Sequence, residues 1–207
     1  MTGPGHRRPQ DAVHHDTGSD PGPQSRRLTK GERRRASLVA AAAELILAEG
    51  PQSVTHRAVA ARAGSSLSAT TYYFADLPDL LGAAGELLMG RWADRAEAVA
   101  ERAEHAAGAA EVMDPVALLL EAVLPRPEQV RGHYQQLVGA GVSPAVTRAY
   151  RSGRHRLDAA VGRLLRAGGS ACPPELAVAV VDGAVVTALS EGTDVTAAAT
   201  SLLRRVL

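Results

Sequence analysis

Hydroxyl and phenol side chains are concentrated in the segment Leu67–Phe74, which reads L-S-A-T-T-Y-Y-F. Such groups can donate hydrogen bonds to the phosphates or base edges of a nucleic acid. Consecutive helical positions are about 100° apart, so three adjacent aromatic residues cannot all face one core. We therefore expect Phe74 to pack inward against Val59, and Tyr72 and Tyr73 to point outward. A solvated aromatic end of an ordinary core helix would give the same pattern.

This segment is the second half of a pattern that is typical of a helix-turn-helix. Thr55 can cap a first short helix, because its hydroxyl can accept a hydrogen bond from a free amide of the first turn. Gly64 can end that helix in a left-handed conformation, and Ser66 can cap a second helix that runs through Thr70 to Phe74. Two short helices joined by about four residues around a glycine predict this motif, whose second helix enters the DNA major groove.

A resemblance to a known family lies in the run that begins at Thr55, T-H-R-A-V-A-A-R-A-G-S-S-L-S-A-T-T-Y-Y-F-A-D-L-P-D-L-L. The run is similar to the N-terminal DNA-binding domain of the TetR family of transcription regulators, and the specific similarity extends from Arg33 to Leu81. Members of that family are all-helical dimers that pair a three-helix DNA-binding head with a variable body for ligand binding and dimerisation. The resemblance therefore implies an all-α homodimer that binds a double-stranded DNA operator.

The resemblance also implies which residues contact DNA. Arg57 is the best candidate for reading a base, because a guanidinium can pair bidentately with guanine. Members of the family often carry a lysine, which meets a phosphate of the DNA, where this chain has Leu77. A leucine side chain cannot make that contact. The full set of DNA-binding residues that we expect is Lys30, Arg34, Thr55, His56, Arg57, Ser66, Leu67, Ser68, Ala69, Thr71, Tyr72 and Tyr73.

An excess of basic over acidic residues is found in the N-terminal part of the chain. The stretch from Arg26 to Arg62 holds eight basic residues and three acidic ones, a net charge of +5, whereas the whole chain carries only +1. Arg26 and Arg27 precede the first expected helix and could follow the DNA backbone or the minor groove. The cluster that starts at Lys30 fits phosphate contact and a solvated helix face equally well.

Length and composition are those of a globular protein of one or two domains. The sequence of 207 residues is 45% hydrophobic and has no apolar run long enough to span a membrane. Its one cysteine, Cys172, rules out an internal disulfide and suits a cytoplasmic location. Too few apolar residues occur before residue 28 to offset the entropy of ordering. We expect a disordered tail over 1–27, a helix-turn-helix domain over 28–75 and a helical ligand-binding and dimerisation domain over 76–207.

The expected body is a series of helices separated by Pro and Gly residues. Apolar spacing and caps predict helices near 30–49, 77–106, 115–124, 128–139, 144–167 and from 193 or 196 to 206. A pocket between such helices would be mainly aliphatic, which favours a small hydrophobic ligand. The residues that we expect to line it, each of which could equally be plain core, are Trp92, Met113, His133, Tyr134 and Leu137.

The segment 175–190 is ambiguous from its residues alone. Its β-branched residues around Asp182-Gly183 are typical of a β-hairpin, although apolar residues also fall at helical spacing. The resemblance favours a long apolar helix, buried on one side by its own core and on the other by a second subunit. The residues expected at that dimer interface are Leu157, Val161, Val180, Ala184 and Leu189.

No residue pattern predicts catalysis. The sequence lacks the nucleophile, zinc-protease, P-loop and dinucleotide fingerprints, and its histidines have no matching metal-ligand spacing. We therefore expect no metal, no cofactor and no enzyme activity. The function that fits best is a sequence-specific DNA-binding regulator, a repressor that a small hydrophobic ligand releases from its operator. The alternatives are a helical protein-interaction module without DNA binding, and an all-α enzyme.

Overall fold

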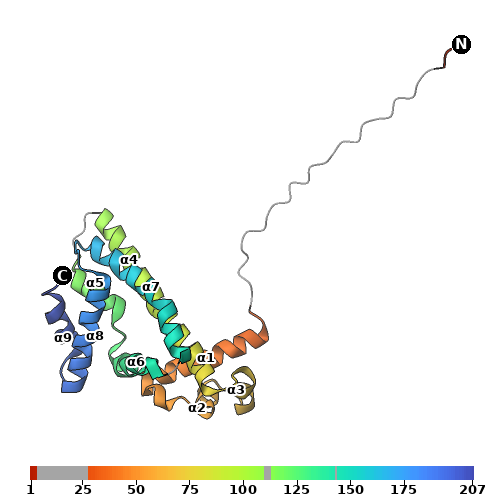
Figure 1. Cartoon of the computed structure of the whole chain (residues 1–207), viewed down its shortest axis with the longest axis horizontal. Coiled ribbons are helices and arrows are strands. Elements are labelled where there is room, and N and C mark those ends of the chain that lie inside the picture. The colour runs from red at the N-terminus through yellow and green to blue at the C-terminus, as the bar shows by residue number, and fades with distance from the viewer. Residues whose placement is uncertain (4–27, 110–112, 143) are drawn as a thin grey trace.

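The computed structural model describes residues 1–3, 28–109, 113–142 and 144–207. Within these residues the regular structure is helical throughout (Figure 1). The α-helices are α1 (Lys30–Glu49), α2 (His56–Arg62), α3 (Leu67–Tyr73), α4 (Leu77–Gly108), α5 (Pro115–Val123), α6 (Pro127–Gly139), α7 (Pro144–Ala167), α8 (Pro174–Glu191) and α9 (Val195–Leu203). Two short 3-10 turns, η1 (Pro51–Ser53) and η2 (Ala140–Val142), follow α1 and α6. The expected all-α fold is confirmed.

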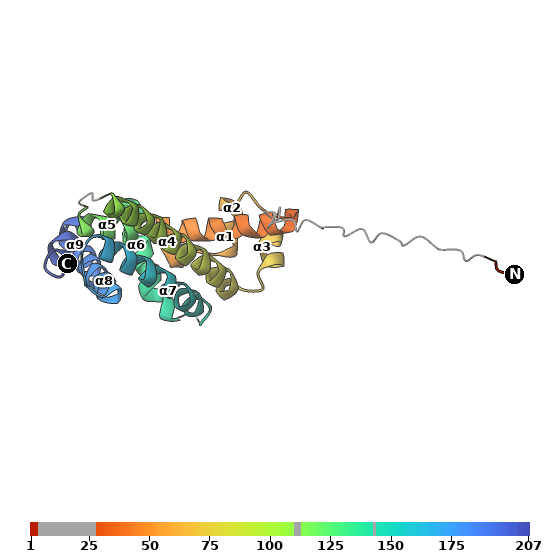
Figure 2. The ribbon, with the colours of Figure 1, turned by 90° about the horizontal axis from the view of Figure 1, so that it is seen from above.

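Helices α1, α2 and α3, which we call the head, lie at the opposite end of the molecule from α8 and α9 (Figures 1 and 2). The head has its own apolar core, in which Leu38, Ile46, Val59 and Phe74 are fully buried. Thr29 begins α1 with a capping box, because its hydroxyl accepts from the Glu32 amide and the Glu32 carboxylate accepts from the Thr29 amide. The core and the caps together fix the position of α3.

Helices α4–α9, which we call the body, enclose a second apolar core. Side chains from α4, α5, α7 and α8, such as Leu119, Leu164 and Val181, are fully buried there. The long helix α4 joins the two parts of the molecule, because Leu80 near its start packs in the head core and Val99 packs in the body core. Any displacement of α4 therefore moves both cores.

Helices α4 and α7 run parallel and in close contact. Glycines allow the approach at one end: a β-carbon on Gly82 would lie only 2.9 Å from the Ala145 side chain. Ion pairs join the helices further along, where the Arg156 guanidinium donates to Glu97 at 2.7 Å and the Arg163 guanidinium to Glu104 at 2.6 Å. These contacts join α4 and α7 from the start of both helices to near the end of both.

The expected helices match the observed ones closely, and the ambiguous segment 175–190 is helical. One face of α8 packs on the body core through Ala177, Val181 and Val185, while Leu176 and Val186 on the other side are exposed. The last helix ends earlier than expected, because α9 stops at Leu203 and the chain closes in a turn. The tail that we expected to be disordered spans 1–27, and residues 4–27 of it lie outside the described residues.

Candidate functional site

Helices α2 and α3 form the helix-turn-helix with the caps that their sequence implies. The Thr55 hydroxyl accepts from the Ala58 amide at 3.0 Å, and the Ser66 hydroxyl accepts from the Ala69 amide at 3.2 Å. Gly64 lies between the helices with a φ of 57°, a conformation that costs glycine little. These contacts set the angle at which α3 leaves the turn.

Helix α3 has one face turned into the head and one turned to solvent. Thr70 and Phe74 are fully buried, as expected for Phe74, whereas Tyr72 is 81% exposed. Tyr73 differs from its expected outward position, since it is half-buried and packs against the head core. Its place three residues after Thr70 turns it partly toward the same buried face.

The twelve residues expected to contact DNA all retain some exposure. Lys30 and Arg34 lie on the first turns of α1, and the others lie on or beside α2 and α3. Those with exposed side chains are Lys30, Arg34, Thr55, Arg57, Ser66, Leu67, Ser68, Thr71 and Tyr72. His56, Ala69 and Tyr73 are half-buried. The twelve residues therefore all lie on the head and keep at least part of their surface accessible.

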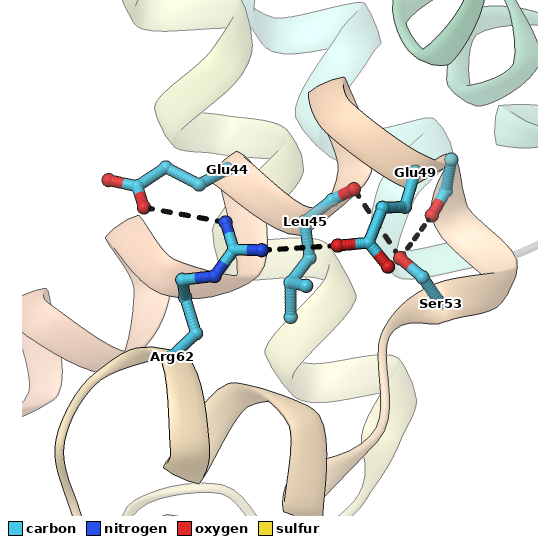
Figure 3. Close-up of polar contacts among 6 residues, drawn as sticks. Glu44, Leu45, Glu49, Ser53 and Arg62 are labelled. Atoms are coloured by element: carbon cyan, nitrogen blue, oxygen red, sulfur yellow. Dashed lines mark hydrogen bonds and ion pairs between the residues drawn. The ribbon is translucent and has the colours of Figure 1, made fainter.

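Several head arginines are already engaged within the protein. Arg62 donates to Glu49 at 3.1 Å and lies 3.9 Å from Glu44, which ties α2 to α1 (Figure 3). The Arg35 guanidinium sits over the Phe74 ring, 4.9 Å from its centroid. The guanidinium groups of Arg62 and Arg35 therefore make contacts within the head.

Arg57 and Lys30, in contrast, have no acidic partner among the described residues. Among the described residues, Arg34 makes only a long hydrogen bond, 3.5 Å, to the Ser65 hydroxyl in the turn. A cation without an internal partner keeps its full charge for an external anion. These three residues are the best-placed cations of the head for contact with a phosphate or a base.

The expected ligand residues do not surround one cavity. Trp92 and His133 line a cavity of about 290 Å³, Trp92 and Leu137 line a second of about 270 Å³, and Tyr134 lines a third of about 630 Å³. Met113 packs against the body core and lines none of these three cavities. The expectation of a single pocket lined by all five residues is therefore revised, because α4 and α6 turn these side chains toward different neighbours.

Trp92 and His133 form a buried aromatic contact between α4 and α6. The Trp92 indole nitrogen donates to the Val123 carbonyl at 3.0 Å, and the two rings meet edge to face with centroids 4.6 Å apart. Burial lowers the pKa of His133 to about 4, so the imidazole is neutral near pH 7. Its Nε2 atom is buried and has no hydrogen-bond partner among the described residues.

A second polar contact in the body joins α6 to α8. The Tyr134 hydroxyl donates to the Asp182 carboxylate at 3.0 Å. Burial, followed by the nearby Asp182 charge, raises the pKa of Tyr134, and burial raises the pKa of Asp182. The pair thus stabilises the packing of α6 on α8 at neutral pH.

The residues expected at a dimer interface divide into two groups. Leu157 and Val161 are fully buried inside the protomer, so their side chains have no surface to offer to a partner. Val180 and Leu189 are half-buried on α8, and Ala184 is almost fully buried but borders a groove between α8 and α9. Only α8 therefore offers the expected side chains to a partner.

Three cations near Trp92 were not among the expected site residues. Arg91, Arg95 and Arg126 line the cavity that contains Trp92 and His133. The spacing of Arg91 and Arg95, four residues apart on a helix and on either side of Trp92, was a usable signal, because it places both on one face. Arg126 gave no such signal in the sequence, since it lies between two helices.

Two further properties concern the described residues only. They contain no group of three or more potential ligands that could hold a metal ion. None of their helices is long and apolar enough to cross a membrane.

Comparison with known proteins gives a consistent result. Residues 107–207 match the family model described as the C-terminal domain of tetracyclin repressor-like proteins. No curated protein matches the sequence.

Solved structures resemble the chain over most of its length. A putative TetR-family transcriptional regulator from Mesorhizobium loti aligns with a TM-score of 0.62 and 17% identity, over 87% of this chain and 98% of its own. The multidrug binding protein EbrR, complexed with ethidium, aligns with a TM-score of 0.59 and 24% identity, over 84% and 98%. A TetR-family member from Streptomyces coelicolor aligns with a TM-score of 0.54 and 27% identity, over 84% and 98%.

Proposed function

Because the chain belongs to the TetR family of transcriptional regulators, we propose that it represses transcription by binding a double-stranded DNA operator as a homodimer. In this proposal residues 28–75 form the DNA-binding domain and 76–207 the ligand-binding and dimerisation domain. The protein acts in the cytoplasm, where its operator is accessible. A regulator of this kind needs no catalytic residues, and the sequence contains none of the catalytic motifs considered above.

The exposed face of α3 carries the proposal. Thr70 and Phe74 anchor the helix in the head, while Ser68, Thr71 and Tyr72 project from it. A helix held in this way can enter the major groove and present its outer side chains to base edges. Leu67 adds an exposed apolar group, 51% accessible, that fits a thymine methyl.

The cations around α3 complete the interface. Arg57 lies on α2, next to the recognition helix, and can pair with guanine or with a phosphate. Lys30 and Arg34 at the start of α1 serve as phosphate contacts. Phosphate contacts position the protein, whereas Arg57 and the α3 side chains supply the sequence preference.

The exposed face of α8 supports dimerisation. Ala179, Val180, Gly183 and Thr187 border the groove between α8 and α9, and Val186 beside them is 45% exposed. Small side chains let two helices approach closely, and burying this face in a second subunit would remove apolar surface from water. A dimer of this kind places two heads on successive half-sites.

A small hydrophobic molecule that binds in the body is the proposed release signal. The relative EbrR is described as a multidrug binding protein and its structure contains ethidium. The cavities of this chain that border Trp92, Leu137 and Tyr134 lie between body helices. A ligand releases DNA only if it binds the released arrangement of the heads more tightly than the bound one.

Selection of bound DNA from a random pool tests the proposal. We expect enrichment of a palindrome whose half-sites lie about one helical turn, or a multiple of it, apart. Affinity for the selected site should fall steeply with salt, because phosphate contacts release counterions. If no sequence were enriched and no duplex were retained at low salt, the protein would instead be a helical interaction module without DNA binding.

A further inference from the structure

The cavity lined by Trp92 and His133 lies where the head meets the body, and we call it the junction cavity. Its walls come from α1 through Leu47, from α4 through Trp92 and from α6 through His133. The three helices lie next to one another in both views of the ribbon (Figures 1 and 2). A molecule in this cavity would therefore contact the head and the body at once.

Three arginines contribute to the lining of the junction cavity. Arg91 and Arg95 are one helical turn apart on α4, and Arg126 adds a third guanidinium from the segment between α5 and α6. No acidic residue lines the cavity among the described residues, and none of the three arginines forms an ion pair with them. The planar, two-pronged guanidinium group is well suited to bind a carboxylate or another oxyanion.

The rest of the lining is mainly apolar, with Gln129 as a further polar side chain, and it contains one buried polar atom without a partner. Leu47, Leu88 and Val123 line it together with the Trp92 ring. His133 is only 7% exposed, and its Nε2 atom has no hydrogen-bond partner in the described part of the chain. A buried polar atom without a partner is costly and commonly marks a place where a ligand or water belongs.

We propose that the junction cavity binds an anionic amphipathic small molecule, with its acid group on Arg91, Arg95 and Arg126 and its apolar part against Trp92. If the protein is the proposed regulator, this molecule is its effector. Only that role as effector rests on the proposed function. The negative charge departs from the hydrophobic ligand expected from the sequence, because the three arginines were not among the expected pocket residues. The apolar part of the ligand would still contact the aliphatic side chains of the cavity.

The position of the cavity explains how such a ligand would act on DNA binding. Leu47 belongs to the last turn of α1, and Gly132 on α6 packs tightly against the same turn. A ligand that fills the space between Leu47, Trp92 and His133 favours one placement of α1, together with α6, against α4. Because α1 forms part of the head core, the angle of the head changes with it.

The test compares three probes that share one apolar chain, octanoate, octan-1-ol and octylammonium. Trp92 is the only tryptophan of the chain and lines the cavity, so its fluorescence reports binding directly in the absence of DNA. We expect octanoate to bind at least tenfold more tightly than either other probe. Arg95→Gln and Arg126→Gln should each weaken octanoate binding about tenfold, as loss of a charged hydrogen bond does.

Arg151→Gln is the matched control, because Arg151 lines another cavity that also borders Trp92, and does not line the junction cavity. It should leave octanoate binding unchanged. The proposal is overturned if octanoate gives no Trp92 response at millimolar concentration. It is equally overturned if the alcohol or the ammonium binds as tightly, or if Arg151→Gln has the effect expected of Arg95→Gln. Octanoate binding without any selected operator would remove the regulator proposal and leave the cavity assignment intact.

Discussion

Gly132 on α6 packs directly against the carbonyl oxygen of Ile46 on α1, and a β-carbon at position 132 would have no room. The Leu47 carbonyl lies equally close to the same position. One turn further along, Gln135 on α6 touches Gly50, which ends α1 with a φ of 87°. The body is therefore fitted against the end of the first head helix by backbone contact, which leaves little freedom for α1 to shift without α6.

The first prediction concerns this contact. Gly132→Ala should lower the free energy of unfolding by about 1–3 kcal/mol, because the added methyl meets backbone atoms that cannot move aside cheaply. The matched control is Gly90→Ala on α4, where a β-carbon meets open space. That change should raise stability by roughly 0.5–1 kcal/mol through helix propensity. Urea denaturation of both variants checks the opposite signs, and equal effects would contradict the tight contact.

The second prediction concerns base reading by Arg57. Arg57→Ala should weaken operator binding by about 1–3 kcal/mol and relax the preference at one base position, because its guanidinium has no acidic partner among the described residues. Arg102→Ala, which removes the same charge from the Glu121 pair in the body, is the control and should leave the preference unchanged. Binding to a library of single-base operator variants provides the measurement. An unaltered preference in Arg57→Ala would exclude the base contact.

The third prediction concerns the dimer. A charge at Ala184 would be buried inside the protomer, whereas Gly183 beside it is exposed and a side chain there meets open space. Gly183→Asp should therefore fold normally and yet dissociate the dimer, because two subunits would bury the unpaired charges at their contact. Light scattering gives the mass, and circular dichroism confirms folding. A folded Gly183→Asp dimer that still binds the operator would place the interface elsewhere.

The sequence predicted the head better than the body, for physical reasons. Caps at Thr55 and Ser66 and the glycine at 64 act locally, so they are visible in a short segment and appear in the structure. The orientation of Phe74 followed from helical spacing in the same way. Tyr73 was placed only partly correctly, because the angle of α3 against α1 decides how far it turns inward.

The body residues depend on contacts between distant segments. The long helix over 144–167 was predicted with its observed bounds, because Pro144 and Gly168 mark its ends. Leu157 and Val161 lie on the apolar face expected for this helix, but nothing local indicated that the core of the same protomer would bury them. The five expected ligand residues divided among cavities for the same reason. Which side of a helix meets a cavity is settled by how all its neighbours pack.

The last prediction concerns pH. Burial holds the pKa of folded His133 at about 4, compared with 6.5 for an unperturbed histidine. Between these values the unfolded chain binds a proton that the folded protein does not, so stability falls as the pH is lowered from 6.5 to 4. The loss at the acidic end should approach about 3 kcal/mol. His133→Gln cannot take up that proton, so its stability should depend less on pH.

Urea denaturation at pH 7.5 and 4.5 measures this difference. His133→Gln also loses its ring contact with Trp92, which lowers stability at both pH values and cancels when the two are compared. Asp182, whose pKa is raised by burial, contributes the opposite dependence, since the folded protein takes up its proton first as the pH falls. That contribution is common to both proteins. Parallel losses of stability in the wild type and in His133→Gln would show that His133 is not buried in its neutral form.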